Sequence, residues 1–295
     1  MIAVADVGGT KIRYGTYEGG RLEVLGEVRT PKDEPIWKKL YELFKGLEAD
    51  AISLATMGPL KLSEGKIVSN PHSEIKEQEL AGPLMRSLKK EVIMINDAVA
   101  GAYAEFRNRD VENLVYVAFG TGVGVGAVVD GKLLLGKEGN AHEMGHAVLA
   151  LGSGLECGCG KRDHAEALLG GSNLPKFFKR SGFDVASAKE AFELMRRNER
   201  AFELFSKALN SFLASLVVAY DPEVLVLGGG VYFKNADVFS RALRELPSYL
   251  LWEPPSLEPA LFGELSPLYG AGLLGEERPN WLLRKLRYVS LPPPL

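Results

Sequence analysis

The sequence predicts an α/β protein made of two similar domains. Apolar segments with the spacing of strands are mixed with amphipathic segments with the spacing of helices along the 295 residues. Each half of the chain opens with a pair of strands and a glycine-rich turn. We therefore expect two domains facing a cleft, with residues 1–110 in the first, 111–265 in the second, and helices within 266–295 returning to the first.

The first half of the chain has a clear pattern. Segments 2–6, 11–17 and 21–29 are predicted strands, and the Glu-Gly-Gly sequence before residue 21 is typical of a hairpin turn. A helix is expected after Pro35, because apolar residues recur there at helical spacing, at Ile36, Leu40, Leu43, Phe44 and Leu47. Further strands are expected at 51–56 and 91–95, and further helices at 79–90 and 98–108.

The second half repeats this order. A strand at 114–120 leads into a hairpin with its turn at Asp130–Gly131, and the strand at 223–231 ends in three glycines. Residues 198–220 form the strongest predicted helix, because they carry a wide apolar stripe. Residues 138–171, rich in Gly and His, allow no simple assignment.

Composition narrows the class of protein. The chain is 46% hydrophobic and 25% charged with a net charge of −3, as in an ordinary soluble globular protein. A nucleic-acid partner is not expected, because there is no basic excess. The N-terminal apolar run lacks the basic region of a signal peptide, and no run approaches the ~18 apolar residues of a membrane span. The cytoplasm is therefore expected, and two cysteines are too few for a disulfide scaffold.

Three glycine-rich turns, at 6–11, 120–124 and 228–230, each follow an apolar strand. Glycine lets backbone N–H groups approach a phosphate closely, so the three together indicate a nucleotide site. A tight hairpin turn is the alternative for any one of them. None fits the P-loop pattern or a G-x-G-x-x-G turn that opens a helix.

Asn96 and Asp97 stand where a predicted strand ends and a helix begins. Asn and Asp cap helices, because their side chains accept bonds from the first free N–H groups. A carboxylate at a strand end is also typical of a catalytic site in α/β proteins. The two roles are compatible.

The motifs DVGGTK, NDA, GTGVGVG, HEMGH, CGCG…HAE and LGGG, in this order, resemble the ROK family of sugar kinases and related repressors. The resemblance runs from residue 2 to about residue 275 and is most specific at the Glu-x-Gly-His sequence beside Cys-x-Cys-Gly. It implies two ribonuclease-H-like domains of the actin and hexokinase superfamily around a cleft. It also implies phosphorylation of hexoses with ATP and Mg²⁺.

The resemblance assigns roles to site residues. Asp97 would be the general base that accepts the proton of the sugar hydroxyl. The residues expected to contact the sugar are Asn70, Asn96, Asp97, Glu143, His146 and Glu166. Asp6 would hold Mg²⁺ through water. The residues expected around the phosphates and the adenosine are Gly8, Gly9, Thr10, Lys11, Gly120, Thr121, Gly122, Gly228, Gly229 and Gly230.

The cysteine segment departs from the family pattern, which is Cys-x-Cys-Gly-x-x-Gly-Cys-x-Glu. Asp163 replaces its second Gly and His164 its third Cys, whereas Cys157, Cys159 and Glu166 match. The resemblance also implies that one ring nitrogen of His146 faces a metal and that the other faces the sugar. A structural Zn²⁺ on His146, Cys157, Cys159 and His164 is therefore expected. Two reduced thiols without metal, or a strained redox pair, are the alternatives.

The resemblance implies an ATP-dependent hexokinase or glucokinase that phosphorylates the 6-hydroxyl of glucose or a related hexose. Alternatives within the family are kinases of N-acetylmannosamine, N-acetylglucosamine, fructose or allose. A sugar-sensing repressor is less expected, because its N-terminal winged helix has no room before Asp6. An actin-like ATPase would lack the Glu-x-Gly-His motif. Dimers are common in the family, so a homodimer is one expectation.

Overall fold

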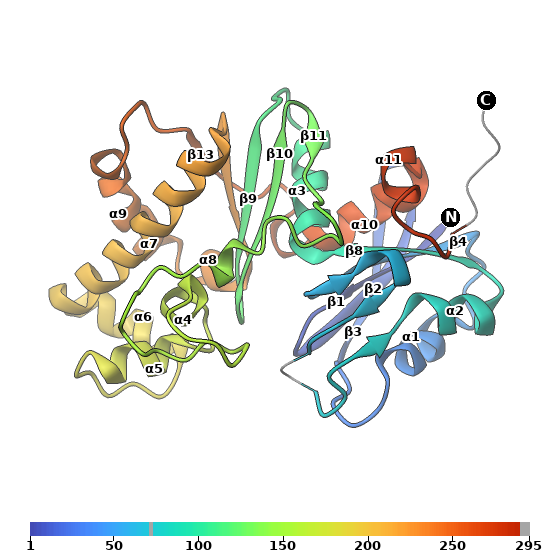
Figure 1. Cartoon of the computed structure of the whole chain (residues 1–295), viewed down its shortest axis with the longest axis horizontal. Helices are drawn as coiled ribbons and strands as arrows, with labels where there is room; N and C mark the ends of the chain where they lie inside the picture. Colours follow the sequence, from blue (N-terminus) through green and yellow to red (C-terminus); the bar gives the residue numbers. More distant parts are fainter. Residues whose placement is uncertain (71–72, 290–295) are drawn as a thin grey trace. The chain divides into compact units, whose positions relative to one another are not determined.

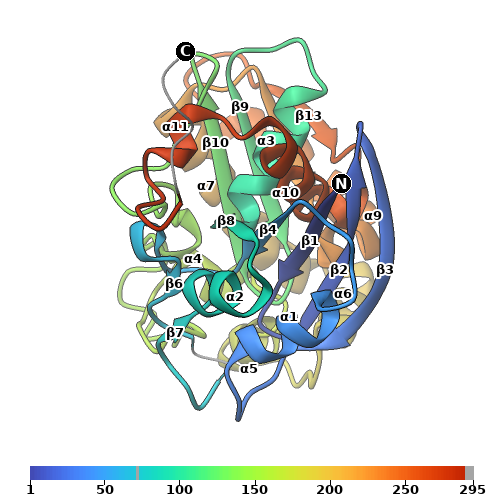
Figure 2. The same cartoon turned by 90° about the vertical axis from the view of Figure 1, so that its right-hand side faces the viewer.

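A computed structural model describes residues 1–70 and 73–289 (Figures 1 and 2). Within it the chain divides into two compact units. Of the described residues, the first holds Met1–Asn108, Leu133–His142 and those from Leu265 to Val289, and the second holds Arg109–Lys132 and Glu143–Glu264. Segment Leu133–His142 lies inside the range predicted for the second domain, and its contacts group it with the first unit.

The first unit is built on a five-stranded sheet with the order β3-β2-β1-β4-β8. The first three strands form an antiparallel meander, whereas β4 and β8 run parallel to β1. The strands are β1 (Ile2–Val7), β2 (Lys11–Glu18), β3 (Arg21–Arg29), β4 (Ala51–Thr56) and β8 (Glu91–Asn96). A small second sheet joins β5 (Leu60–Lys61), β6 (Lys66–Ile67) and β7 (Gln78–Glu79), with the short helix η1 (Leu62–Glu64) between β5 and β6.

Helices cover both faces of this sheet, because its central strands are apolar on both sides. Ala3, Ala5 and Val7 of β1 share a core cluster with α1 (Ile36–Phe44) and α2 (Ala81–Leu88). The alternate residues Ile2 and Val4 pack with Leu268 of α10 (Ser266–Glu277). Helix α3 (Asp97–Arg107) packs against α10, and α11 (Asn280–Leu283) is the last helix of the described residues.

Helices α3 and α10 lie backbone to backbone. A Cβ atom added at Gly270 would lie only 1.8 Å from the carbonyl oxygen of Ala100. No side chain fits in that space, so glycine is the residue that lets the two helices meet. Helix α10 thereby supports the helix whose first residue is Asp97.

The second unit repeats the sheet of the first. Its strand order is β11-β10-β9-β12-β13, in which β12 runs parallel to both β9 and β13. The strands are β9 (Leu114–Phe119), β10 (Val123–Val129), β11 (Lys132–Leu133), β12 (Val224–Gly228) and β13 (Ser256–Pro259). Positive φ angles of 50° at Asp130 and 67° at Gly131 form the predicted hairpin turn between β10 and β11.

The remaining elements of this unit are helical. They are η2 (Met144–His146), α4 (Ala165–Leu169), α5 (Leu174–Arg180), α6 (Ala188–Arg197), α7 (Glu199–Tyr220), α8 (Gly230–Lys234), α9 (Ala236–Ala242), η3 (Leu243–Tyr249) and η4 (Gly263–Leu265). Helix α7 begins where predicted, because the Asn198 side chain accepts a bond from the backbone N–H of Ala201.

Helix α7 is, within the described residues, long and apolar enough to cross a membrane when judged by length and composition alone. Its most apolar window is 67% buried inside the protein. Phe205, Leu209 and Leu213 are fully buried, as in the core helix of a globular unit.

Candidate active site

Two carboxylates lie at the carboxyl edge of the first sheet. Asp6 is near the end of β1, and Asp97 follows the last residue of β8. Strand β4 lies between them, and the register aligns Asp6 with Ala55 and Ala55 with Ile95. Because the three strands are parallel, both acids lie at the same edge. Each keeps some exposed surface.

The structure separates the roles of Asn96 and Asp97. Asn96 is the N-cap of α3, and its Oδ1 accepts a hydrogen bond from the Val99 N–H at 3.2 Å. Asp97 is the first helical residue, and its Oδ1 accepts from the Ala98 N–H at 2.7 Å. The N-cap bond therefore belongs to Asn96. Burial raises the pKa of Asp97, although the N–H bonds oppose this effect.

The pKa of Asp6 is raised as well. Burial, and then the negative charge of Asp97, raise the pKa of Asp6 to about 7. The cations of Arg13 and Lys11 oppose this rise. Arg13 stands directly opposite Asp6 on β2, and its guanidinium lies 3.2 Å from a Glu27 carboxylate oxygen on β3. Asp6, Arg13 and Glu27 therefore form a row of alternating charge across β1, β2 and β3.

The turn after β1 is closed by its own hydrogen bonds. The Gly8 N–H donates to the Lys11 carbonyl at 3.0 Å, and the Thr30 hydroxyl donates to the Gly8 carbonyl at 2.6 Å. The Thr30 N–H donates to the Thr10 carbonyl at 3.1 Å. Gly8 to Lys11 thus form a compact turn beside Asp6.

The Gly120–Gly122 turn has one glycine that packing does not explain. A Cβ at Gly120 would meet no atom within 4 Å, so the space there is open. Gly122 is different, because a Cβ there would lie 2.2 Å from Oε2 of Glu166. The Gly171 N–H donates to the Gly120 carbonyl at 2.9 Å, and the Ser172 N–H donates to the Thr121 carbonyl at 3.0 Å.

The glycines at the end of β12 are needed by the protein's own packing. A Cβ at Gly228 would lie 2.7 Å from the Tyr116 hydroxyl oxygen. Gly229 has a φ of 86°, and a Cβ there would lie 2.4 Å from the Phe119 carbonyl oxygen. Gly230 is less crowded, with Oε1 of Glu264 at 3.1 Å. An adenosine is thus not required to explain Gly228 and Gly229.

Asn70, predicted to contact the sugar, is 1% exposed in the first unit. Its N–H donates to the Lys76 carbonyl at 2.9 Å, and its carbonyl accepts from the Ser73 N–H at 3.4 Å. The backbone of Asn70 therefore anchors the loop that carries it.

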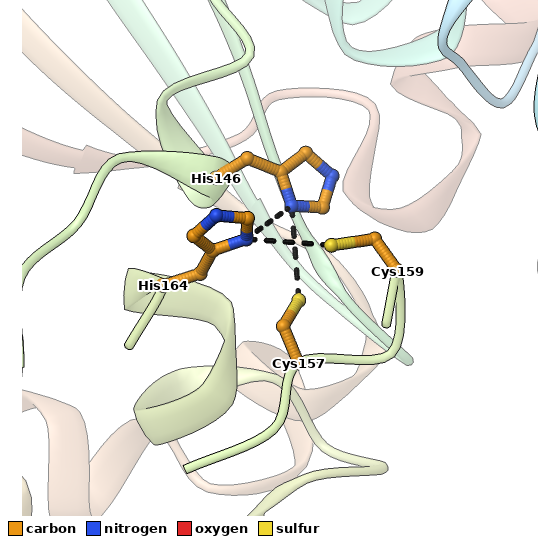
Figure 3. Close-up of side chains that lie close together, drawn as sticks. All are labelled: His146, Cys157, Cys159 and His164. Carbon is orange, nitrogen blue, oxygen red and sulfur yellow. Dashed lines mark hydrogen bonds between the residues drawn. The ribbon is translucent and has the colours of Figure 1, made fainter. Parts of the chain in front are cut away.

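Four predicted metal ligands come together in the second unit (Figure 3). Their ligand atoms all lie within 4.8 Å of one another. Nδ1 of His146 lies 3.3 Å from Nδ1 of His164 and 3.7 Å from Sγ of Cys157. Sγ of Cys159 lies 3.4 Å from Nδ1 of His164. We name this set, His146, Cys157, Cys159 and His164, the metal cage.

The three shortest-range spacings just given, 3.3, 3.7 and 3.4 Å, are close to those around one tetrahedral zinc ion. Zn–N bonds of ~2.0–2.1 Å and Zn–S bonds of ~2.3 Å at tetrahedral angles separate two nitrogens by about 3.3 Å and a nitrogen and a sulfur by about 3.6 Å. Burial raises the pKa of Cys157 and lowers the pKa of His164. The protein alone thus favours a neutral thiol and a neutral imidazole, and a bound metal would displace the thiol proton.

Two glutamates border the cage. Nε2 of His146 faces Oε2 of Glu143 at 3.9 Å, so its ring bridges the cage and a carboxylate. Oε1 of Glu166 accepts from the Cys157 thiol at 3.1 Å, and its Oε2 accepts from the Val123 N–H at 3.0 Å. Glu166, predicted to contact sugar, here ties the cage to the start of β10.

Sequence reasoning missed the contacts that hold the segment before Glu143. The Asn140 side-chain amide exchanges two bonds of 2.8 Å with the backbone of Leu60. Glu138 accepts from the N–H and the hydroxyl of Ser63, both at 3.1 Å. No local pattern indicates such pairs, because the partners are 75 or more residues apart.

The two repeated sheets and the paired edge acids define a protein of the actin and hexokinase fold class. A solved ROK hexokinase from Thermus thermophilus has a TM-score of 0.80 and 32% identity over 94% of this chain and 98% of its own. The predicted fold class is thereby confirmed.

The model of the ROK family matches residues 2–278, and the chain belongs to this family. A glucokinase from Pyrobaculum calidifontis is 36% identical, covering 96% of this chain and 97% of its own. An N-acetylmannosamine kinase from Haemophilus influenzae is 30% identical, covering 90% of this chain and 92% of its own. The resemblance deduced from the motifs is confirmed.

Asp6 should make the stability of the protein depend on pH. Its folded pKa, about 7, is raised above an ordinary value of 3.8, so its contribution to stability is present below about pH 4 and is lost as the pH rises through 7. Between pH 5.5 and 8.5 the free energy of unfolding of the wild type should therefore fall by about 1–2 kcal/mol relative to that of Asp6→Asn, whose amide does not titrate. Urea unfolding without Mg²⁺ at both pH values measures this difference.

Asp184→Asn, on an exposed loop, is the matched control and should follow the wild type at both pH values. A difference between Asp6→Asn and the wild type that stays constant with pH would contradict the raised pKa.

Proposed function

We propose that the protein is an ATP-dependent hexokinase that transfers the γ-phosphoryl group of MgATP to the 6-hydroxyl of glucose or a related hexose. Its similarity to a glucokinase over nearly the full length of both chains supports this activity. The observation that carries the chemistry is Asp97, a carboxylate at a strand end whose neighbour Asn96 makes the helix-capping bond.

Asp97 is the general base in this proposal. The sugar hydroxyl loses a proton as it attacks the γ-phosphoryl group, and a carboxylate within hydrogen-bond reach accepts it. Burial raises the pKa of Asp97, which makes it a better proton acceptor than an exposed aspartate. In this proposal the amide of Asn96 pairs with a sugar hydroxyl alongside its cap bond.

Asp6 would hold Mg²⁺ through water. A divalent cation beside it would offset the repulsion from Asp97 that now raises its pKa. When bound, Mg²⁺ neutralises charge that develops on the phosphates. The turn at Gly8, Gly9, Thr10 and Lys11 would line the phosphates; the Gly8 N–H already closes the turn, and the Lys11 ammonium lies 2.8 Å from a Glu27 carboxylate oxygen. The open space at Gly120 supports a second phosphate contact there, with Thr121 and Gly122.

For the remaining nucleotide residues, Gly228, Gly229 and Gly230, the proposal rests on the family resemblance. Packing against Tyr116 and Phe119 already explains the first two glycines. We still propose that this turn contacts the adenosine of ATP.

The sugar would be bound by carboxylates and imidazole. Glu143 and His146 lie side by side, and carboxylates suit vicinal diols because they accept two hydrogen bonds. Glu166 and Asn70 complete the proposed set with Asn96. In the ligand-free protein Glu166 binds Val123 and Cys157, so a sugar would share or replace these contacts.

In this proposal the metal cage would also hold a structural Zn²⁺. Two imidazoles and two thiolates are a tetrahedral zinc set, and their spacings support it. The ion would fix the ring of His146, whose Nε2 faces Glu143. It would take no part in the chemistry. We also propose that the protein is cytoplasmic, because of its composition. The family resemblance further favours a homodimer.

Kinases of N-acetylmannosamine are the second candidate, because one is 30% identical over 90% of this chain. A coupled assay for ADP release across glucose, mannose, fructose, allose, N-acetylglucosamine and N-acetylmannosamine decides between them. We expect turnover with glucose and at least one further hexose. Turnover with N-acetylmannosamine alone would reject the hexokinase.

Asp97→Asn should lower kcat about 10²–10⁴-fold, because it removes the proton acceptor and keeps the size of the side chain. The loss corresponds to about 3–5 kcal/mol in the barrier. KM for the sugar should change far less, since an amide still pairs with a hydroxyl. Steady-state kinetics with glucose measure both constants.

The capping alternative is tested in the same series by thermal and urea unfolding. Asn96→Ala should cost about 0.5–2 kcal/mol of stability, because Asn96 makes the cap bond. Asp97→Ala should cost less than that. If Asp97→Asn keeps more than about a tenth of wild-type turnover, Asp97 is not the base.

Protein purified without added metal should contain one Zn²⁺ per chain by elemental analysis. Chelation should lower the melting temperature, because metal binding is coupled to folding. Cys157→Ser and His164→Ala should each lose both the metal and the sensitivity to chelator. Less than a tenth of an equivalent of zinc, with full activity, would reject the site.

A further inference from the structure

The two cage cysteines lie on one short hairpin, Leu155–Asp163, which we call the cage hairpin. The Cys157 N–H donates to the Lys161 carbonyl at 2.7 Å, and the Asp163 N–H donates to the Leu155 carbonyl at 2.8 Å. The turn is closed by the Gly160 N–H, which donates to the Cys157 carbonyl at 2.9 Å. His164 follows directly, so three of the four cage ligands depend on this hairpin.

Asp163 fastens the cage hairpin to the loop that precedes it. Its Oδ1 accepts from the Gly154 N–H at 2.7 Å and from the Ser153 hydroxyl at 2.8 Å. Its Oδ2 accepts from the Gly152 N–H at 3.0 Å. One carboxylate thus binds three consecutive residues. These donors hold the pKa of Asp163 below its usual range, the Ser153 hydroxyl contributing most.

The main chain of Asp163 is also engaged. Its carbonyl accepts from the N–H groups of Leu149 at 2.9 Å and Ala150 at 3.1 Å. Its φ is 65°, in the left-handed region that few residues other than Gly, Asn and Asp adopt. Asp163 therefore combines a backbone conformation that favours glycine with a carboxylate.

We propose that Asp163 is a positioning residue that forms the metal cage before the metal arrives. The inference rests on the proposed zinc site. Asp163 is not a cage ligand, since both of its oxygens already bind the 152–154 loop. By ordering that loop and the cage hairpin in the metal-free protein, it reduces the conformational entropy that metal binding must otherwise remove.

The effect should extend to the sugar residues. The cage fixes Nδ1 of His146, whose Nε2 faces Glu143, and Cys157 binds Glu166. A cage that is only partly filled would leave these side chains less ordered. A loss of cage order therefore predicts a higher KM for hexose when zinc is scarce, and recovery when zinc is saturating.

Asp163→Gly is the most informative variant, because glycine adopts this φ without strain and the three hydrogen bonds of the carboxylate are lost. Zinc affinity is measured by competition with a chromogenic chelator. We expect binding about 10–100-fold weaker than in the wild type, the usual effect of removing a group that orients metal ligands. Asp163→Asn and Ser153→Ala should give smaller losses, because each keeps part of the hydrogen-bond set.

Asp130→Gly is the matched control. Asp130 has a similar φ of 50° but lies in the β10–β11 turn, so its loss should leave zinc affinity unchanged. Hexose KM is compared at limiting and saturating zinc. Asp163→Gly should have a raised KM only when zinc is limiting.

The outcomes separate this inference from the zinc proposal. If the wild type binds zinc and Asp163→Gly binds it within twofold as tightly, Asp163 is a local loop residue and the inference is wrong. A raised hexose KM that persists at saturating zinc would also overturn it. If the wild type itself binds no zinc, the zinc proposal fails and this inference fails with it.

Discussion

The backbone contact between α3 and α10 is the constraint on which the first unit depends. At Gly270 the two helices approach so closely that even a methyl group is excluded. Helix α10 lies on β1 and β4, and α3 lies on α10. The depth at which α10 seats on the sheet therefore sets the position of Asp97 at the start of α3. The carboxylate that we propose as the general base is thus positioned by the packing of a helix far away in the sequence.

The two units share one sheet topology but carry different functional residues. Both sheets place a meander beside parallel strands in the same order. In the first unit the carboxyl edge carries two acids, Asp6 and Asp97. In the second, the insertion between β11 and α4 carries the metal cage, and the turn after β9 has the open position at Gly120. The repeated sheet is a scaffold, and the chemistry differs because the loops differ.

Much of the fold was readable from the sequence, because its strands are apolar and its turns are glycine-rich. Strands β3 and β4 match the predicted ranges, and β8 is one residue longer than predicted because Asn96 still pairs in the sheet. Helices α5 and α6 were missed. Their few buried residues, such as Phe192 and Met195, give a signal too short to separate from a loop.

The site was predicted less evenly. The four cage ligands were expected from the family resemblance, and the structure brings them together. Which of Asn96 and Asp97 caps the helix was not decidable, because both residue types cap well. The glycines of the β12 turn were ascribed to a ligand, whereas contacts with Tyr116 and Phe119 explain two of them. Such contacts join distant segments, and no local pattern encodes them.

The first unit is discontinuous in the chain, and this has a consequence for synthesis. Its sheet is complete once residue 96 has been made, but the helix that covers Ile2 and Val4 begins at Ser266. The native cover of this face is therefore made only after the whole second unit, whose last residue is Glu264. The topology thus allows the second unit to complete its fold before the first, whereas domains usually fold N-terminal first.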